Sequence, residues 1–426
     1  MRFWNGSTLF CILLAGSLLA QETVSPYATS EPLDPNFKSF DQTIIAFMQR
    51  HNVPGGALAV VREGKLVYVQ GYGFADKDRQ EPARATSLFR IASISKPITA
   101  VAILKLAQST RYHLDLDTKA FPLLGIMPFL EKTTKPDPRL SRITIRQLLQ
   151  HTAGFDRDRS GDPMFDPLHI AKVVGTSAPP TPNTIIRYMM GRPLDFTPGS
   201  RHVYSNFGYC VLGRIIEKVT GKPYEAYVRE AILAPIQIRR MRIGKSLLAD
   251  RAKGEVRYYQ ESLGHTTSVF PIGEKEAPWC YGGFYLEAMD SHGGWLASAV
   301  DLARFAAQLD VPNTPAPLDA KHMAEMGDLP PAPVARKSNG TPEPAYYGLG
   351  WNVRPVGKSG KANYWHTGSL PGSFTLLVRR SDGITWAVLF NQRSENEGEI
   401  DPALHRAANA VPLWEPKDLF NKYLSP

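Results

Sequence analysis

A serine and a lysine stand three residues apart in the segment FRIASISKP, residues 89–97. Proline lacks an N–H and is tolerated only in the first turn of a helix, so Pro97 predicts a helix that begins near Ser93. Ser93 and Lys96 then share one helix face, close enough for the amine to take the hydroxyl proton. Lysine serves as this base only if burial lowers its pKa well below the free value of about 10.4. Taken alone, the pattern also fits a capping serine followed by a solvated lysine.

Two further patterns add chemistry to this pair. Tyr204-Ser205-Asn206 opens the next long helix, and His366-Thr367-Gly368 ends a strand near the carboxyl end. The order SxxK, YxN and then a basic residue before Thr-Gly resembles the serine β-lactamase and penicillin-binding superfamily. More closely, it resembles the class C β-lactamase-related branch, which includes esterases, D-aminopeptidases and D-Ala-D-Ala carboxypeptidases.

The resemblance extends beyond these patterns, over roughly residues 40–410. Three other segments look like family landmarks: LLQHTAG at 148–154, GGWLAS at 293–298 followed by DLA at 301–303, and YGLGW at 347–351.

The resemblance implies a role for each matching residue. Ser93 attacks the substrate carbonyl and forms an acyl-enzyme, while Lys96 and Tyr204 share proton transfer. Tyr204 acts either as a phenolate or as a hydrogen-bonded relay to the leaving group. Asn206 positions Lys96 and the substrate amide. Thr367 and Gly368 belong to the substrate-binding strand, and the backbone N–H groups of Ser93 and Ser369 form the oxyanion hole.

The chain departs from the family pattern at His366, where β-lactamases and transpeptidases of the family carry lysine. A lysine ammonium can anchor a substrate carboxylate, whereas histidine, with a free pKa of about 6.5, is largely neutral at physiological pH. In the family, histidine at this position is usual among esterase and peptidase-like members. His366 therefore favours ester or amide substrates that need no carboxylate.

Other candidate chemistry is weaker. His151 ends a short helix and is interpreted as structural, because the chain has no GxSxG segment for a Ser-His-Asp triad. His292 is interpreted as structural too, although it can approach the cleft. The Gly-Lys-Ser segments at 244–246 and 357–359 lack the earlier glycine of a phosphate-binding loop. The charged loop at 156–159 is interpreted as a solvated rim, and a position at the border of the substrate entrance is the alternative. No cofactor or metal is implied.

Hydropathy patterns predict an α/β (α+β) fold. A hairpin is expected at 56–72, helices at 41–49, 144–150, 206–219 and 401–410, and strands at 347–353, 362–366, 374–379 and 384–391. Residues 100–107 are apolar on nearly every face and predict a fully buried helix. We expect an antiparallel sheet flanked by helices, built from residues 41–92 and 344–426, with a mostly helical lobe at about 93–343 and the active site at their junction, as in the β-lactamase/transpeptidase fold.

The amino terminus predicts export. Arg2, an apolar run at 9–20 and small residues before Ala20 match a secretory signal peptide of residues 1–20, which a tether at 21–40 follows. A run of this length is too short to span a bilayer, which takes about 20 apolar residues. We therefore expect a periplasmic or secreted protein without a membrane span. Cys210 and Cys280 either pair in that oxidising compartment or remain thiols.

Composition says little about partners. The formal net charge of +9 comes from interleaved basic and acidic residues, which argues against a nucleic-acid surface. The expected partner is a small ester, amide or peptide substrate, and the oligomeric state stays open. The leading hypothesis is an exported serine hydrolase that forms an acyl-enzyme. The alternatives are a D-amino-acid peptidase or carboxypeptidase on cell-wall fragments, a β-lactamase, and a slowly acylated binding or sensor protein without turnover.

Overall fold

The computed structural model describes residues 27–131, 134–271, 275–309, 316–358 and 360–423. The segment interpreted as a signal peptide, residues 1–20, lies outside these ranges. Within them, no helix has both the length and the apolar character needed to cross a membrane.

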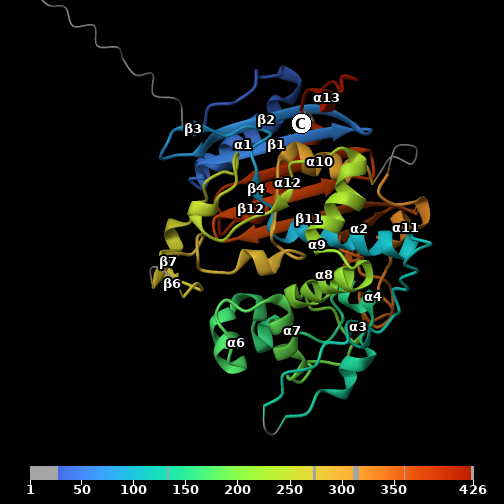
Figure 1. Ribbon diagram of the computed structural model, residues 1–426. Helices are drawn as coiled ribbons and strands as arrows, with labels where there is room; N and C mark the ends of the chain where they lie inside the picture. The colour runs from blue at the N-terminus through green and yellow to red at the C-terminus, as the bar shows by residue number, and fades with distance from the viewer. Residues whose placement is uncertain (1–26, 132–133, 272–274, 310–315, 359, 424–426) are drawn as a thin grey trace, which may run out of the picture.

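The central element is an eight-stranded antiparallel sheet in which the two ends of the chain meet. Its strand order is β3-β2-β1-β13-β12-β11-β10-β9, and β1 pairs with β13 at the seam. Figure 1 shows this seam as blue strands beside red ones. The strands are β1 (Gly55–Arg62), β2 (Lys65–Asp76), β3 (Glu81–Pro82), β9 (Tyr346–Tyr347), β10 (Asn352–Val356), β11 (Lys361–Leu370), β12 (Ser373–Arg379) and β13 (Ile384–Phe390). The antiparallel sheet expected from the sequence is confirmed.

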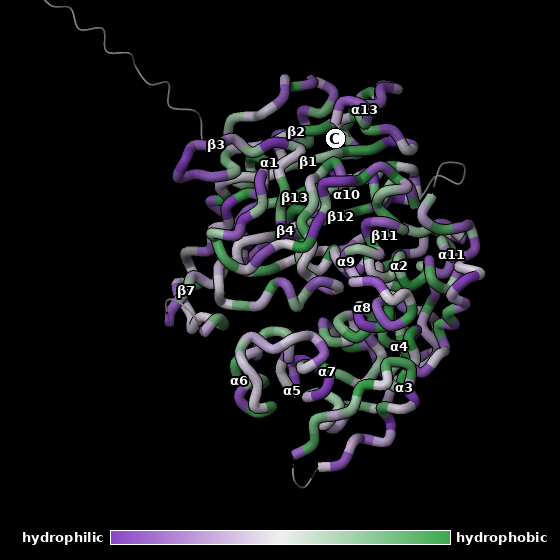
Figure 2. The backbone as a smooth tube through the Cα atoms, viewed as in Figure 1, coloured by the Kyte–Doolittle hydropathy of each residue, from purple (hydrophilic) through white to green (hydrophobic). Residues whose placement is uncertain are grey.

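Side chains alternate between the two faces of the sheet along each strand, and helices cover both faces. In β1, Leu58 and Val60 face a cluster that includes residues of α1 (Lys38–Arg50) and α12 (Ile400–Asn409). Ala57 and Ala59 face the opposite cluster, which includes α10 (Ala299–Ala307). Figure 2 shows the central strands as largely hydrophobic, as burial on two faces requires.

A second body, mostly helical, lies below the sheet in Figure 1. Its elements are α3 (Ala120–Leu124), α4 (Ile145–Leu149), α5 (Arg157–Ser160), α6 (Pro167–Val174), α7 (Pro182–Met190), α8 (Asn206–Thr220) and α9 (Tyr224–Val228). The Ser205 hydroxyl caps α8 at its start, and Gly221 ends it with a φ of 69°. Thr144 and Gln147 form a reciprocal capping box on α4. Two further short helices lie in the carboxyl-terminal half of the chain: α11 (Ala320–Glu325) and α13 (Phe420–Tyr423).

The structure differs from the expected boundaries in the part called the tether. Within residues 27–40, Thr29 bridges to Tyr72 of β2, and the ring of Phe37 stacks on Tyr68 at 4.6 Å. Phe37 and Phe40 are buried, so this stretch packs on the sheet instead of standing free of it.

The expected lobe is also less purely helical than its sequence suggests. β4 (Phe89–Arg90) leaves the main sheet and joins β8 (Trp295–Ala297) and β5 (Arg242–Ile243) in a three-stranded sheet. A hairpin of β6 (His265–Thr267) and β7 (Glu276–Pro278) adds two more strands. Helix α10, whose residues fall within the range expected for the lobe, packs on the main sheet against β1 and β13. Cys210 and Cys280 are both buried and unpaired.

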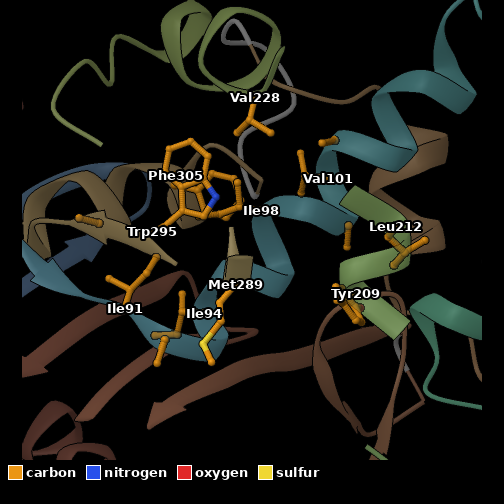
Figure 3. Packing of buried hydrophobic residues seen from close by; sticks show 14 of the residues in the cluster. Ile91, Ile94, Ile98, Val101, Tyr209, Leu212, Val228, Met289, Trp295 and Phe305 are labelled. Carbon is orange, nitrogen blue, oxygen red and sulfur yellow. The ribbon is translucent and has the colours of Figure 1, made fainter. Parts of the chain in front are cut away.

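Helix α2 (Ser95–Gln108) connects the two bodies and is buried along almost its whole length, as predicted. Figure 3 shows Ile98 and Val101 of α2 in the cluster that also holds Trp295 and Phe305. The single strand expected at 347–353 is split, because Gly350 turns the chain with a φ of 84° and brings it against α2. A Cβ at Gly350 would overlap the Cβ of Ala100.

Gly350→Ala should therefore destabilise the protein by at least about 2 kcal/mol, from left-handed backbone strain together with overpacking. Urea unfolding measures this loss. Gly357→Ala is the matched control, because Gly357 has a φ of 61° but nothing within 4 Å of an added Cβ. Equal losses in the two variants would contradict the packing argument.

Candidate active site

The candidate nucleophile lies in a strained turn just before α2. Ser93 is the middle residue of the 3₁₀ turn Ala92–Ile94, and α2 itself begins at Ser95, two residues later than Ser93. Ala92 has a φ of 46°, a left-handed conformation that costs a non-glycine residue about 1–3 kcal/mol. Ile91 and Ile94, buried on either side of Ser93, hold the turn in place (Figure 3).

Strand β12 and glycine in β11 fix the same turn from the sheet side. The Ser373 hydroxyl donates to the Arg90 carbonyl at 2.5 Å, and the Thr375 hydroxyl donates to the Ile91 carbonyl at 3.0 Å. A Cβ at Gly368 would overlap both the Ile91 carbonyl oxygen and Thr375 Oγ1. Glycine is therefore required in the His-Thr-Gly segment so that β11 can approach the serine.

Lys96 is fully buried and has three polar contacts. Its Nζ lies 2.7 Å from Asn206 Oδ1, 2.9 Å from the His292 carbonyl oxygen and 3.1 Å from Ser93 Oγ. Burial lowers the pKa of Lys96 well below its ordinary value. This shift favours the neutral amine, which is the form that can accept a proton.

These three contacts also orient the amine. A neutral amine has two N–H donors and one lone pair. The oxygens of Asn206 and His292 can only accept, so they take the two N–H groups. The lone pair is then left for the Ser93 hydroxyl, as general-base catalysis requires.

Tyr204, the third residue expected to take part in proton transfer, lies beside Lys96. Tyr204 lines the same cavity as Ser93, and its ring centroid lies 4.7 Å from Lys96 Nζ. Burial raises the pKa of the Tyr204 phenol above its ordinary value, which keeps the hydroxyl protonated near pH 7. Of the two roles that the sequence left open, this environment favours the hydrogen-bonded relay over the phenolate.

His366 is buried, and both of its ring nitrogens are engaged. Nδ1 lies 2.7 Å from the Thr367 carbonyl oxygen and must donate to it, so Nε2 accepts from the Tyr347 hydroxyl at 2.9 Å. Burial, with a smaller effect of Lys96, lowers the pKa of His366 to about 3. A neutral imidazole with no spare donor is poorly suited to hold a substrate carboxylate.

One cavity of about 770 Å³ collects these groups. It is lined by nearly all of the expected site residues: Ser93, Tyr204, Asn206, His366, Thr367 and Ser369. The pairing of β11 with β10 stops at Trp365, so residues 366–370 pair only with β12 among the described strands. The other edge of residues 366–370 is therefore available to a substrate. The predicted oxyanion-hole N–H of Ser369 belongs to this stretch. The Ser369 hydroxyl itself donates to Glu397 at 3.1 Å.

The two histidines interpreted as structural have supporting roles. The His151 ring lies 4.4 Å from that of Tyr204, and its Nδ1 accepts the Ser205 backbone N–H at 3.1 Å. His151 thus orients the start of α8. His292 gives its carbonyl oxygen to Lys96 and also lines the cavity.

Asp162 is a residue of the site that could not be recognised from the sequence. Asp162 lines the cavity and accepts a hydrogen bond from Asn206 Nδ2 at 2.6 Å. Its only sequence signal was an aspartate before a proline, which is typical of any helix cap. The described residues contain no cluster of His, Cys, Asp or Glu that could hold a metal ion.

Comparison with known proteins agrees with this geometry. A family model described as Beta-lactamase matches residues 40–410, which contain Ser93, Lys96, Tyr204 and His366. The chain belongs to the beta-lactamase family. It has the fold of the serine β-lactamases and penicillin-binding proteins.

Among other members, penicillin-binding protein 4* of Bacillus subtilis (strain 168) is 26% identical over 376 residues, which are 87% of this chain and 75% of that protein. Protein flp of Staphylococcus aureus (strain MW2) is 32% identical over 203 residues, 47% of this chain. The match spans only 37% of the length of protein flp.

Solved structures share the fold of this beta-lactamase family member. The octameric penicillin-binding protein homologue from Pyrococcus abyssi aligns with a TM-score of 0.65 and 24% identity, over 90% of this chain and 79% of that one. The D-amino acid amidase from Ochrobactrum anthropi SV3, complexed with L-phenylalanine amide, aligns with a TM-score of 0.65 and 22% identity, over 89% and 99%. The expected fold class is therefore confirmed.

The buried His366 should make stability depend on pH. Unfolding restores an ordinary pKa near 6.5, so the unfolded imidazole binds a proton that the folded one, with a pKa of about 3, does not. Above pH 6.5, the contribution of His366 to the free energy of unfolding does not change with pH. Between pH 6.5 and pH 3, this one group lowers the free energy of unfolding by about 1.4 kcal/mol for each pH unit.

In His366→Gln, the free energy of unfolding should fall less steeply over this window. Urea titrations at a series of pH values measure the slope. Part of the slope should remain, because burial also lowers the pKa of His151 and His292. Parallel curves for the two proteins would contradict a neutral, buried His366.

Proposed function

We propose that the chain is an exported serine hydrolase that turns over esters or small amides through an acyl-enzyme on Ser93. The observation that carries the proposal is the contact of the fully buried Lys96 amine with Ser93 Oγ at 3.1 Å. The apolar run at residues 9–20 supports export to the periplasm or the medium.

The proposed reaction follows from the contacts. As Ser93 Oγ bonds to the substrate carbonyl carbon, its proton passes to Lys96, and the carbonyl oxygen becomes an oxyanion near the Ser93 and Ser369 backbone. When the bond to the leaving group breaks, Lys96 returns the proton to it through Tyr204. Water then attacks the acyl-enzyme, giving the acid and regenerating the Ser93 hydroxyl.

The environment of His366 supports esters or amides without an obligatory carboxylate. A β-lactam or a D-Ala-D-Ala peptide presents a carboxylate, which a family lysine at this position would pair with. Here both His366 nitrogens are engaged within the protein, and the ring is neutral. Turnover of β-lactams is therefore expected to be slow.

A second candidate is hydrolysis of D-amino-acid amides or peptides that carry a free ammonium group. The exposed carboxylate of Asp158 lines the cavity and would pair with such a cation. D-amino acid amidase, one of the structures of the same fold, adds weight to this candidate.

The test compares the mature protein with Ser93→Ala on p-nitrophenyl butyrate, an amino-acid p-nitroanilide with a free amine, and a chromogenic cephalosporin. Wild type should hydrolyse the ester and carry the acyl mass on Ser93. The variant should lose about 10³-fold or more of this activity, because no nucleophile remains. Ser95→Ala is the matched control, since the Ser95 hydroxyl accepts a hydrogen bond from the Trp295 backbone N–H and does not line the cavity.

Faster turnover of the anilide than of the ester would favour the second candidate. Rapid cephalosporin turnover would contradict the argument from His366. A stable adduct without turnover would make the protein a ligand sensor, and activity that survives in Ser93→Ala would exclude Ser93 as the nucleophile.

A further inference from the structure

Asp162 is hydrogen-bonded to the asparagine that contacts the reactive lysine. Its Oδ2 lies 2.6 Å from Asn206 Nδ2, and its Oδ1 accepts the Met164 backbone N–H at 3.1 Å. Asp162 caps the 3₁₀ turn Pro163–Phe165 and lines the same cavity as Ser93. One carboxylate oxygen therefore fixes the turn, and the other fixes Asn206.

Only one orientation of the Asn206 amide satisfies both of its neighbours. An ionised carboxylate accepts hydrogen bonds but cannot donate them, so the amide NH₂ must face Asp162. The amide oxygen is then turned toward Lys96, at 2.7 Å. A flipped amide would place its oxygen against the carboxylate and its NH₂ against the amine.

The orientation matters because a neutral Lys96 has a single lone pair. With the amide oxygen toward it, Lys96 donates to Asn206 and keeps the lone pair for Ser93. With the amide NH₂ toward it, the lone pair would accept from Asn206 and would be lost to the serine.

We propose that Asp162 is a positioning residue of the active site, which holds the Asn206 amide so that the lone pair of Lys96 points to Ser93. The proposal rests on the proposed function, since it assumes that Lys96 deprotonates Ser93. Asp162 acts through Asn206 and needs no contact with the substrate.

The charge of Asp162 has a second effect on the same amine. Burial is the main cause of the low pKa of Lys96, the negative charge of Asp162 raises that pKa, and the positive charge of Arg157 lowers it. The titratable groups around Lys96 come from several elements: Ser93, His151, Arg157, Asp162, Tyr204, Tyr209, His292 and His366. Burial lowers the pKa of the three histidines and raises that of the two tyrosines, so Asp162 and Arg157 are the charged members of this set.

The experiment follows the labelling of Ser93 by a fluorophosphonate, by intact mass, as a function of pH. In this reaction Ser93 Oγ bonds to phosphorus, fluoride leaves and Lys96 takes the proton, so the rate reports the base without any choice of substrate. Asp162→Asn removes the charge but keeps one acceptor oxygen, and Asp162→Ala removes both.

Both variants should move the acid limb of the labelling rate to lower pH by about 1 unit, because Lys96 loses the carboxylate that favours its protonated form. At the plateau, Asp162→Ala should label about 10- to 100-fold more slowly, since the amide is no longer held, and Asp162→Asn should lose less. A merely structural role for Asp162 would lower the folded fraction, seen by thermal melting, without moving the limb.

Asp166→Asn is the matched control, because Asp166 directly follows the same 3₁₀ turn but its side chain neither caps α6 nor lines the cavity. Its acid limb should stay in place. Wild-type labelling rates and an unmoved acid limb in both Asp162 variants, or an equal shift of the limb in Asp166→Asn, would overturn the proposal. The proposed function fails separately, if wild type is not labelled or if Ser93→Ala is.

Discussion

An ammonium group loses its hydration when it is buried, and the resulting cost of several kcal/mol makes deprotonation easier than charge burial. Lys96 has no exposed surface, and burial lowers its pKa well below the ordinary value, which favours the neutral amine. A buried neutral amine still needs partners for its two N–H groups. The start of α8 supplies Asn206 and the loop before β8 supplies the His292 carbonyl, which leaves the lone pair for Ser93. Two distant segments must therefore converge on α2, and much of the fold serves that convergence.

The sheet places its own groups against the same helix through close backbone contacts. Gly368 lets β11 reach the turn that carries Ser93, and Gly350 lets the following segment pack on α2. Strand β11 carries His366, and both ring nitrogens of His366 are hydrogen-bonded, one with the Tyr347 hydroxyl and the other with the Thr367 carbonyl oxygen. Near Ser93 the third motif is thus neutral. Of the charged residues that line the cavity, Arg157, Asp158 and Asp162 come from one segment, and Arg393 lies apart from them in the sequence. Selectivity toward charged substrates is accordingly expected to depend on that segment.

Much of this arrangement could be predicted from the sequence because the signals are local. Pro97 predicted a helix that begins near Ser93, and α2 begins two residues later, at Ser95. Thr144 and Gly221 predicted the start of α4 and the end of α8, where the structure also has them. The alternation of strand residues gave the antiparallel sheet. The residues that escaped prediction depend on contacts across the fold. The strand expected at 347–353 is interrupted by the packing of Gly350 on Ala100, and Asp162 joins the site only because its turn lies against Asn206.

A direct test of the account is the pKa of Lys96 in the resting protein, measured by NMR on chains labelled with lysine carrying ¹³C at Cε. The Lys96 signal is assigned as the one missing from Lys96→Met. The Lys96 signal should titrate well below those of the other lysines, which should titrate near the ordinary value of about 10.4. A Lys96 signal that titrates together with them would show a charged lysine in the resting site, and would contradict its role as the base for Ser93.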